Sequence, residues 1–93
     1  MITLPRDDLK KQEILQKIMQ KFQKDKIYDE KEVNDIIKSF DVDDHVLFRR
    51  ELINFGYMQR DPYKGTYWLI KEKLSEEELN DIGSRQKKIS KMD

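Results

Sequence analysis

Apolar residues recur at intervals of three and four positions along the first half of the chain, which is the spacing of one face of a helix. The first stripe predicts a helix over residues 8–24. A second helix is predicted to begin after Asp29, because Asp29 and Glu32 have the spacing of a reciprocal capping box. The apolar positions expected to face the core are Leu9, Ile14, Leu15, Ile18, Met19 and Phe22 in the first helix and Val33, Ile36, Ile37 and Phe40 in the second.

The segment DVDDHVLFRRELINFG predicts a third helix. Asp41, Asp43 or Asp44 can cap its start by accepting hydrogen bonds from free backbone N–H groups. The helix is predicted to run to Phe55 and to end at Gly56, where the absence of a Cβ atom allows the left-handed conformation.

After this helix the apolar period changes to two, which indicates strands. Residues 57–61 and 66–70 predict the two arms of a β-hairpin, with Pro62 and Gly65 in the turn between them. Neighbouring side chains of a strand point to opposite faces, and of the two adjacent aromatic residues Trp68 is predicted to pack in the core.

The C-terminal region predicts a marginal helix, with a capping box from Ser75 to Glu78 and an end at Gly83. The last residues are expected to fray as a cationic tail, whose basic residues are Arg85, Lys87, Lys88 and Lys91. The chain is therefore divided into residues 1–74, a winged-helix-like domain, and residues 75–93, a short helix with a charged tail.

Three helices, a hairpin and a short C-terminal helix place the protein in the α+β class. This order is typical of the winged form of the helix-turn-helix, in which the third helix is the usual recognition element and the hairpin is the wing. The fold class alone does not determine the function.

Several short motifs carry a family resemblance. They are Leu4–Pro5, Ile14–Leu15, Phe22, YDEKEVN from Tyr28 to Asn34, DHVLFRREL from Asp44 to Leu52, Arg60 and Tyr67–Trp68. With its EVN, RREL and YW motifs, this set resembles a bacterial family of domains of unknown function, which occur alone or behind the helix-turn-helix domain of transcriptional regulators. The resemblance implies a winged-helix-like fold and an association with transcription regulation, and it implies no catalytic residue or ligand.

The composition limits the protein to one domain, because a chain of 93 residues cannot enclose a second core. The sequence has no cysteine, which fits a reducing compartment, and no apolar run that resembles a signal peptide or a membrane span. A soluble cytoplasmic protein is expected.

Arg49 and Arg50 are predicted to have different roles although they are neighbours. At about 100° per residue, Arg49 falls inside the apolar sector of the third helix, beside Phe48. Its guanidinium is expected to form a structural ion pair with Glu32 or Asp44, so that Arg49 serves the fold before it serves any binding.

Arg50 falls on the outer face of the same helix, with Leu47 and Asn54. Nearby Asp43 and Glu51 would repel phosphates, which is unusual in a helix that reads DNA. An arginine beside an exposed leucine fits a protein interface instead. The alternative function is therefore a protein-interaction or dimerisation module that uses this outer face.

The hairpin is more favourable to DNA, because Arg60, Tyr63, Lys64 and Lys71 give it a surface that can contact phosphates. Lys plus Arg and Asp plus Glu both number 19, so the chain as a whole does not attract a polyanion. The expected function is a non-catalytic accessory domain of transcription regulation with weak or no autonomous DNA binding. The expected partners are duplex DNA, another protein of the transcription machinery or a second copy of the chain.

Catalysis and metal binding are not expected. The segment DVDDH gathers three carboxylates with His45, but helix capping explains these aspartates and no metal-ligand spacing recurs elsewhere. No serine stands in a glycine elbow, and the three glycines are isolated from one another, so neither a hydrolase triad nor a phosphate-binding loop is predicted. No cofactor is predicted.

Overall fold

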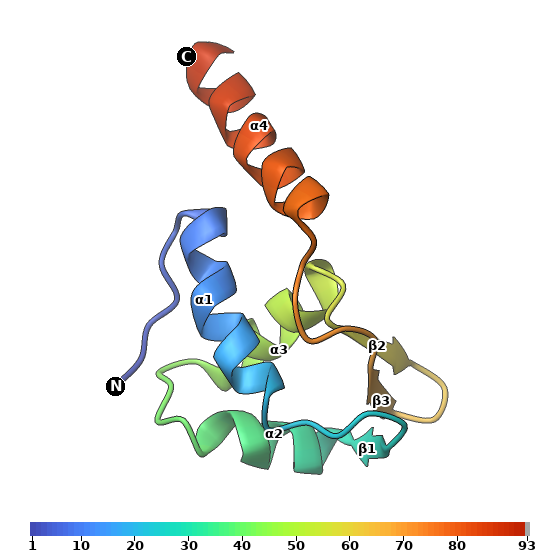
Figure 1. Ribbon diagram of the computed structural model, residues 1–93. Helices are drawn as coiled ribbons and strands as arrows, with labels where there is room; N and C mark the ends of the chain where they lie inside the picture. The colour runs from blue at the N-terminus through green and yellow to red at the C-terminus, as the bar shows by residue number, and fades with distance from the viewer. Residues whose placement is uncertain (93) are drawn as a thin grey trace.

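The computed structural model describes the backbone of residues 1–92 and the side chains of residues 1–84 (Figure 1). The elements in chain order are α1 (Asp8–Met19), β1 (Ile27–Asp29), α2 (Glu30–Lys38), α3 (His45–Asn54), β2 (Met58–Asp61), β3 (Thr66–Leu69) and α4 (Glu76–Met92). The predicted α+β class is confirmed. Over the part of the chain that the structure describes, no helix is long and apolar enough to cross a lipid bilayer.

The strands form one antiparallel sheet in the order β1-β3-β2, with α2 and α3 packed against it. The β2–β3 hairpin is present as predicted, and Asp61 closes its turn by accepting hydrogen bonds from the N–H groups of Tyr63 and Lys64. Strand β1 was not predicted. It has only three residues and leads directly into the α2 capping box, so it offers no alternating pattern to recognise.

The core contains apolar residues from every helix and strand. Its most deeply buried members, with at most 3 % of their surface exposed, are Leu15, Ile18, Met19, Phe22, Tyr28, Val33, Ile37, Phe48, Leu52, Tyr57, Met58 and Tyr67. Helix α1 ends at Met19 instead of residue 24. Phe22 nevertheless reaches the core, because the chain turns there and the N–H of Phe22 donates to the carbonyl of Met19.

The assignment of Trp68 to the core was wrong. Tyr67 is 1 % exposed and packs on the helices, whereas Trp68 is partly exposed on the other face of the sheet. Trp68 stands opposite Ile27 of β1 and Gln59 of β2 on that face. Tyr67 and Trp68 are both aromatic. The strand period of two therefore shows that one of them points inward, without showing which one.

One buried polar network connects α1 to Tyr57, in the short segment between α3 and β2. The Tyr57 hydroxyl donates to Gln12 Oε1 at 2.6 Å, and Gln12 Nε2 donates to the Asp8 carbonyl at 2.6 Å. Gln16 Nε2 also donates to the Tyr57 hydroxyl at 3.3 Å. Burial raises the pKa of Tyr57 above its ordinary value, so the phenol remains a hydrogen-bond donor at neutral pH.

Helix α3 begins and ends by local rules. Asp44 is the N-cap, and its carboxylate accepts from the N–H of Leu47 at 3.1 Å. At the other end Gly56 has a φ of 81°, its N–H donates to the Ile53 carbonyl, and the N–H of Tyr57 donates to the Leu52 carbonyl. This pair of bonds is the Schellman motif, so the predicted end at the glycine is confirmed.

Helix α4 has the predicted capping box, in which Ser75 and Glu78 exchange hydrogen bonds, but its predicted end at Gly83 was wrong. The helix continues to Met92, and a Cβ atom at Gly83 would lie 3.4 Å from Leu9 Cδ1 of α1. The glycine therefore lies inside α4 near Leu9 of α1, at a distance where a Cβ atom would make an ordinary van der Waals contact, and it does not end the helix. The basic residues predicted in the tail begin at Arg85 and lie outside the described side chains.

Lys71, just after β3, donates to the Glu78 carboxylate and so connects the sheet to α4. The hydrogen bond from Lys71 is the largest cause that holds the pKa of Glu78 below its ordinary value, and the backbone N–H of Ser75 adds to it. Figure 1 shows α4 leaving the body of the fold beyond its first turns, which lie beside α1.

Candidate nucleic-acid interface

A groove lies between the outer face of α3 and the β2–β3 hairpin, with a volume of about 590 Å³. Its lining residues are Arg50, Ile53, Asn54, Gln59, Arg60 and Pro62. We call it the α3–hairpin groove. Two guanidinium groups and two carboxamides line it, and no carboxylate does. These polar groups are the ones that proteins use to contact phosphates and base edges.

The groove follows from the way α3 joins β2. Arg50, Ile53 and Asn54 lie three and four positions apart, so they share one face of α3. Strand β2 starts at Met58, only a few residues after α3, and the Schellman turn at Gly56 fixes the angle between the two elements. Gln59 and Arg60 of β2, an edge strand, are both exposed and line the groove together with the α3 residues.

The aspartates near the start of α3 are engaged in the fold. Asp43 accepts a hydrogen bond from the Thr3 hydroxyl at 2.9 Å, Asp44 caps α3, and Asp41 lies 3.5 Å from the N-terminal ammonium group. None of them lines the α3–hairpin groove. The repulsion of phosphate expected from Asp43 beside Arg50 is therefore reduced, because the carboxylate is turned toward the N-terminal segment.

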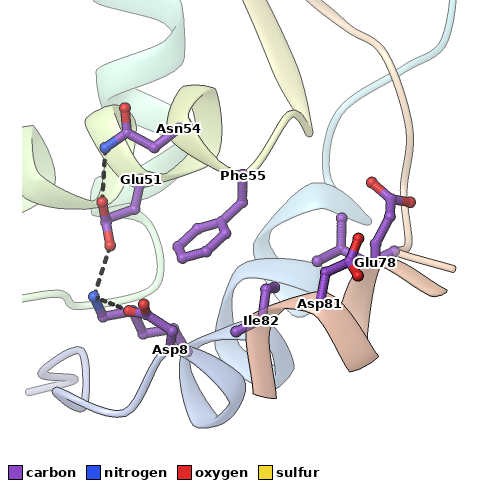
Figure 2. A pocket seen from close by; sticks show the side chains of 9 residues that line it. Asp8, Glu51, Asn54, Phe55, Glu78, Asp81 and Ile82 are labelled. Atoms are coloured by element: carbon purple, nitrogen blue, oxygen red, sulfur yellow. Dashed lines mark hydrogen bonds and ion pairs between the residues drawn. The ribbon is translucent and has the colours of Figure 1, made fainter. Parts of the chain in front are cut away.

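Glu51, the residue after Arg50, is turned toward α1 and does not line the α3–hairpin groove. Lys11 Nζ lies 2.8 Å from Glu51 Oε2 and 2.8 Å from Asp8 Oδ1, and the Glu51 side chain is 12 % exposed. Burial disfavours the charged form of Lys11, but hydrogen bonds and the charges of both carboxylates outweigh it and raise the pKa of Lys11. Figure 2 shows this chain of contacts along a second hollow, which α1, α3 and α4 line.

Arg49 faces inward from α3 and pairs with α2. Its side chain is 16 % exposed, with Nη1 2.6 Å from Asn34 Oδ1 and Nη2 3.4 Å from Glu30 Oε1. The Tyr67 hydroxyl also donates to Glu30, at 3.2 Å. Glu30 and Asn34 are four positions apart and therefore present one face of α2 to Arg49.

The partners predicted for Arg49 were wrong. Glu32 accepts a hydrogen bond from the N–H of Asp29 in the capping box of α2, and Asp44 caps α3. Both carboxylates are engaged at helix N-termini, where the free N–H groups of the backbone need acceptors. Glu30, which lies two positions before Glu32 and on a different face of α2, is the acidic partner instead.

Replacing Arg49 with alanine is expected to lower the free energy of unfolding by about 1.5 to 3 kcal/mol, the range for hydrogen bonds to charged groups. The cost stays below that of breaking a fully buried ion pair, because the Glu30 side chain is 54 % exposed and water can replace the guanidinium. Urea unfolding measures the change. Arg50→Ala is the matched control, and an equal loss in both variants would contradict the structural role of Arg49.

The groove brings together three of the predicted contact residues, Arg50, Asn54 and Arg60. The other three do not line it. Leu47 is 42 % exposed one turn before Arg50 on α3, and Tyr63, which is 98 % exposed, stands with Lys64 at the tip of the hairpin.

Gln59, Ile53 and Pro62 were missed as lining residues. The signal for Gln59 was present, because it follows Met58, which is 2 % exposed, and must therefore point outward from β2. Ile53 is only partly buried against the core, and it also lines the groove.

Among the described side chains, no group of three or more His, Asp or Glu residues is arranged to hold a metal ion. His45 is partly exposed in the first turn of α3, and the aspartates that precede it point to separate partners. The polar groups of the α3–hairpin groove are hydrogen-bond donors and acceptors, so the groove suits binding through hydrogen bonds and ion pairs.

Comparison with known proteins gives a family and no closer relative. The model of a family described as "Uncharacterized protein conserved in bacteria" (DUF2087) matches residues 1–69. No curated protein and no solved structure matches the chain. The matched region ends with β3, so it contains every residue that lines the α3–hairpin groove and excludes α4.

Proposed function

The chain belongs to the bacterial family DUF2087, whose description assigns no activity. We propose that it is a non-catalytic, winged-helix-like domain that contacts duplex DNA. In this proposal α3 is the recognition helix and the β2–β3 hairpin is the wing. The order of elements supports it, since a helix, a strand, two helices and a hairpin form one unit. The domain would be an accessory of transcription regulation and would act in the cytoplasm.

The observation that carries the proposal is the lining of the α3–hairpin groove. Arg50 and Arg60 reach it from two different elements, Asn54 and Gln59 line it with them, and no carboxylate is among its lining residues. Arginine contacts both phosphates and guanine, and carboxamides contact adenine. The net charge of zero gives no long-range attraction, so weak binding that is confined to this surface is expected.

The second candidate is a protein-interaction module on the outer face of α3. Leu47 supports it, because a leucine that is 42 % exposed one turn before Arg50 provides the apolar contact that interfaces use. The partner would be a second copy of the chain or another protein of the transcription machinery. This function requires Leu47 to be covered in the complex, whereas DNA contact through the groove does not.

A titration of random-sequence duplex DNA at low and moderate salt tests the proposal. The unaltered protein is expected to bind more weakly as salt is raised, because phosphate contacts release counterions. Arg50→Ala and Arg60→Ala are each expected to weaken binding and to reduce the slope of log K against log salt by about 1, because each removes one cation that can contact phosphate. Arg6→Ala, at an exposed arginine before α1, is the control and is expected to bind normally.

Sizing of the same samples separates the two functions. A monomer with salt-dependent binding supports DNA contact. A stable dimer that does not bind DNA, and that a Leu47→Glu change converts to a monomer, would overturn the proposal in favour of the interaction module.

A further inference from the structure

We propose that the α3–hairpin groove reads base sequence: Asn54 pairs with an adenine in the major groove, and Arg50 pairs with a guanine about two base pairs away. This inference rests on the proposed function and adds the class of DNA sequence that the same site selects. It assigns Glu51 the role of a positioning residue, which acts through Asn54 without touching DNA.

The Asn54 side chain is held in one orientation by a chain of charged groups. Glu51 Oε1 accepts from Asn54 Nδ2 at 2.8 Å, and Glu51 Oε2 lies 2.8 Å from Lys11 Nζ. The Glu51 and Lys11 side chains are 12 % and 17 % exposed, so packing fixes both (Figure 2). Asn54 is an exposed residue and lines the groove.

Hydrogen-bond counting gives the preferred base. A carboxamide has two N–H donors and one carbonyl acceptor, and Glu51 uses one donor of Asn54. One donor and one acceptor remain, which match the N7 acceptor and the N6 donor that adenine presents in the major groove. Guanine presents two acceptors there, so the carbonyl of a fixed Asn54 would face an acceptor and be left unpaired.

Arg50 supplies the second base contact. It is exposed on the same face of α3, four positions before Asn54, and both line the groove. Four helical residues rise about 6 Å, close to the spacing of two base pairs along the duplex. An arginine fork is complementary to the two acceptors of guanine. The expected element is therefore one guanine and one adenine at a fixed short spacing.

Selection from a library of DNA duplexes with a randomised centre, followed by sequencing of the bound fraction, tests this inference on the full chain. The unaltered protein is expected to enrich one guanine and one adenine at a constant spacing. Competition between duplexes that differ only at the adenine is expected to show a roughly 5- to 150-fold preference. Asn54→Ala is expected to remove the preference for adenine and to retain the preference for guanine.

Variants of Glu51 distinguish positioning from folding. Glu51→Ala is expected to reduce the adenine preference while salt-dependent binding to random duplexes persists, and Glu51→Gln, which keeps an acceptor for Asn54, is expected to restore part of the preference. Thermal unfolding of each variant confirms that the selected population is folded. Gln59→Ala is the matched control, because it removes an amide from the same groove and is expected to lower affinity equally for all sequences.

The possible failures are distinguishable. Salt-dependent binding without any enriched base, or an adenine preference that survives Asn54→Ala, would overturn this inference and leave the proposed function standing. Complete absence of salt-dependent binding would overturn both.

Discussion

Replacing Phe48 with alanine is expected to lower the free energy of unfolding by about 3 to 5 kcal/mol, the range for large-to-small changes at buried aromatic residues. Phe48 is 0 % exposed and belongs to the core on the inner face of α3. Its ring cannot be replaced by rearrangement of close-packed neighbours, so a cavity remains. The total free energy of unfolding of a domain of this size is about 5 to 15 kcal/mol, so the variant is expected to be partly unfolded at moderate temperature.

Urea unfolding at constant pH measures this loss, and Leu47→Ala is the matched control. Leu47 precedes Phe48 on the same helix but is 42 % exposed, so its truncation is expected to change the free energy by about 0.5 kcal/mol or less. Equal losses in the two variants would contradict the orientation of α3. That orientation also turns Arg49 toward α2 and Arg50 toward the groove, so the two functional assignments depend on it.

The orientation of α3 could be predicted because it depends on local rules. The apolar period places Phe48 and Leu52 on one side, and the Asp44 cap and Gly56 end the helix at defined residues. The capping boxes of α2 and α4 and the turn of the hairpin follow from spacings of two to four residues in the same way. Each of these features is set by neighbours in sequence.

Features that depend on contacts between distant segments were not predicted. The acidic partner of Arg49 is determined by how α2 packs against α3, and several carboxylates near Arg49 in sequence or on α2 were equally suitable by residue type. Strand β1 exists because it pairs with β3, and Tyr67 instead of Trp68 enters the core because that pairing fixes the sheet face. No spacing in the sequence contains this information.

The candidate site shows the same division. The helical period placed Arg50 and Asn54 together on the outer face of α3, and both line the groove. Arg50 and Asn54 lie beside Arg60 and Gln59 only because β2 packs beside α3. No pattern in the sequence predicts that packing. The hydrogen bond from Asn54 to Glu51 is local, because the two residues lie three positions apart on α3, whereas the ion pair of Glu51 with Lys11 of α1 joins segments far apart in the chain.

Replacing Ile82 with alanine is expected to lower the free energy of unfolding by about 2 to 5 kcal/mol, the range for a buried isoleucine. Ile82 is 6 % exposed and belongs to the same core as residues of α1 and α3, and Leu79 packs against that core one turn earlier. The first turns of α4 therefore contribute to the stability of the fold, although the boundary predicted from the sequence placed them outside the domain.

The matched control for Ile82→Ala is Asn80→Ala, at an exposed position of the same helix, where the change is expected to be about 0.5 kcal/mol or less. Urea unfolding followed by Trp68 fluorescence reports on the sheet, to which Trp68 belongs and α4 does not, so it shows whether the sheet and α4 unfold together. A single transition shifted by Ile82→Ala is expected. An unchanged sheet transition would show that residues 1–74 fold without help from α4, as the predicted boundary requires. The packing of Ile82 would then not contribute to the stability of the sheet.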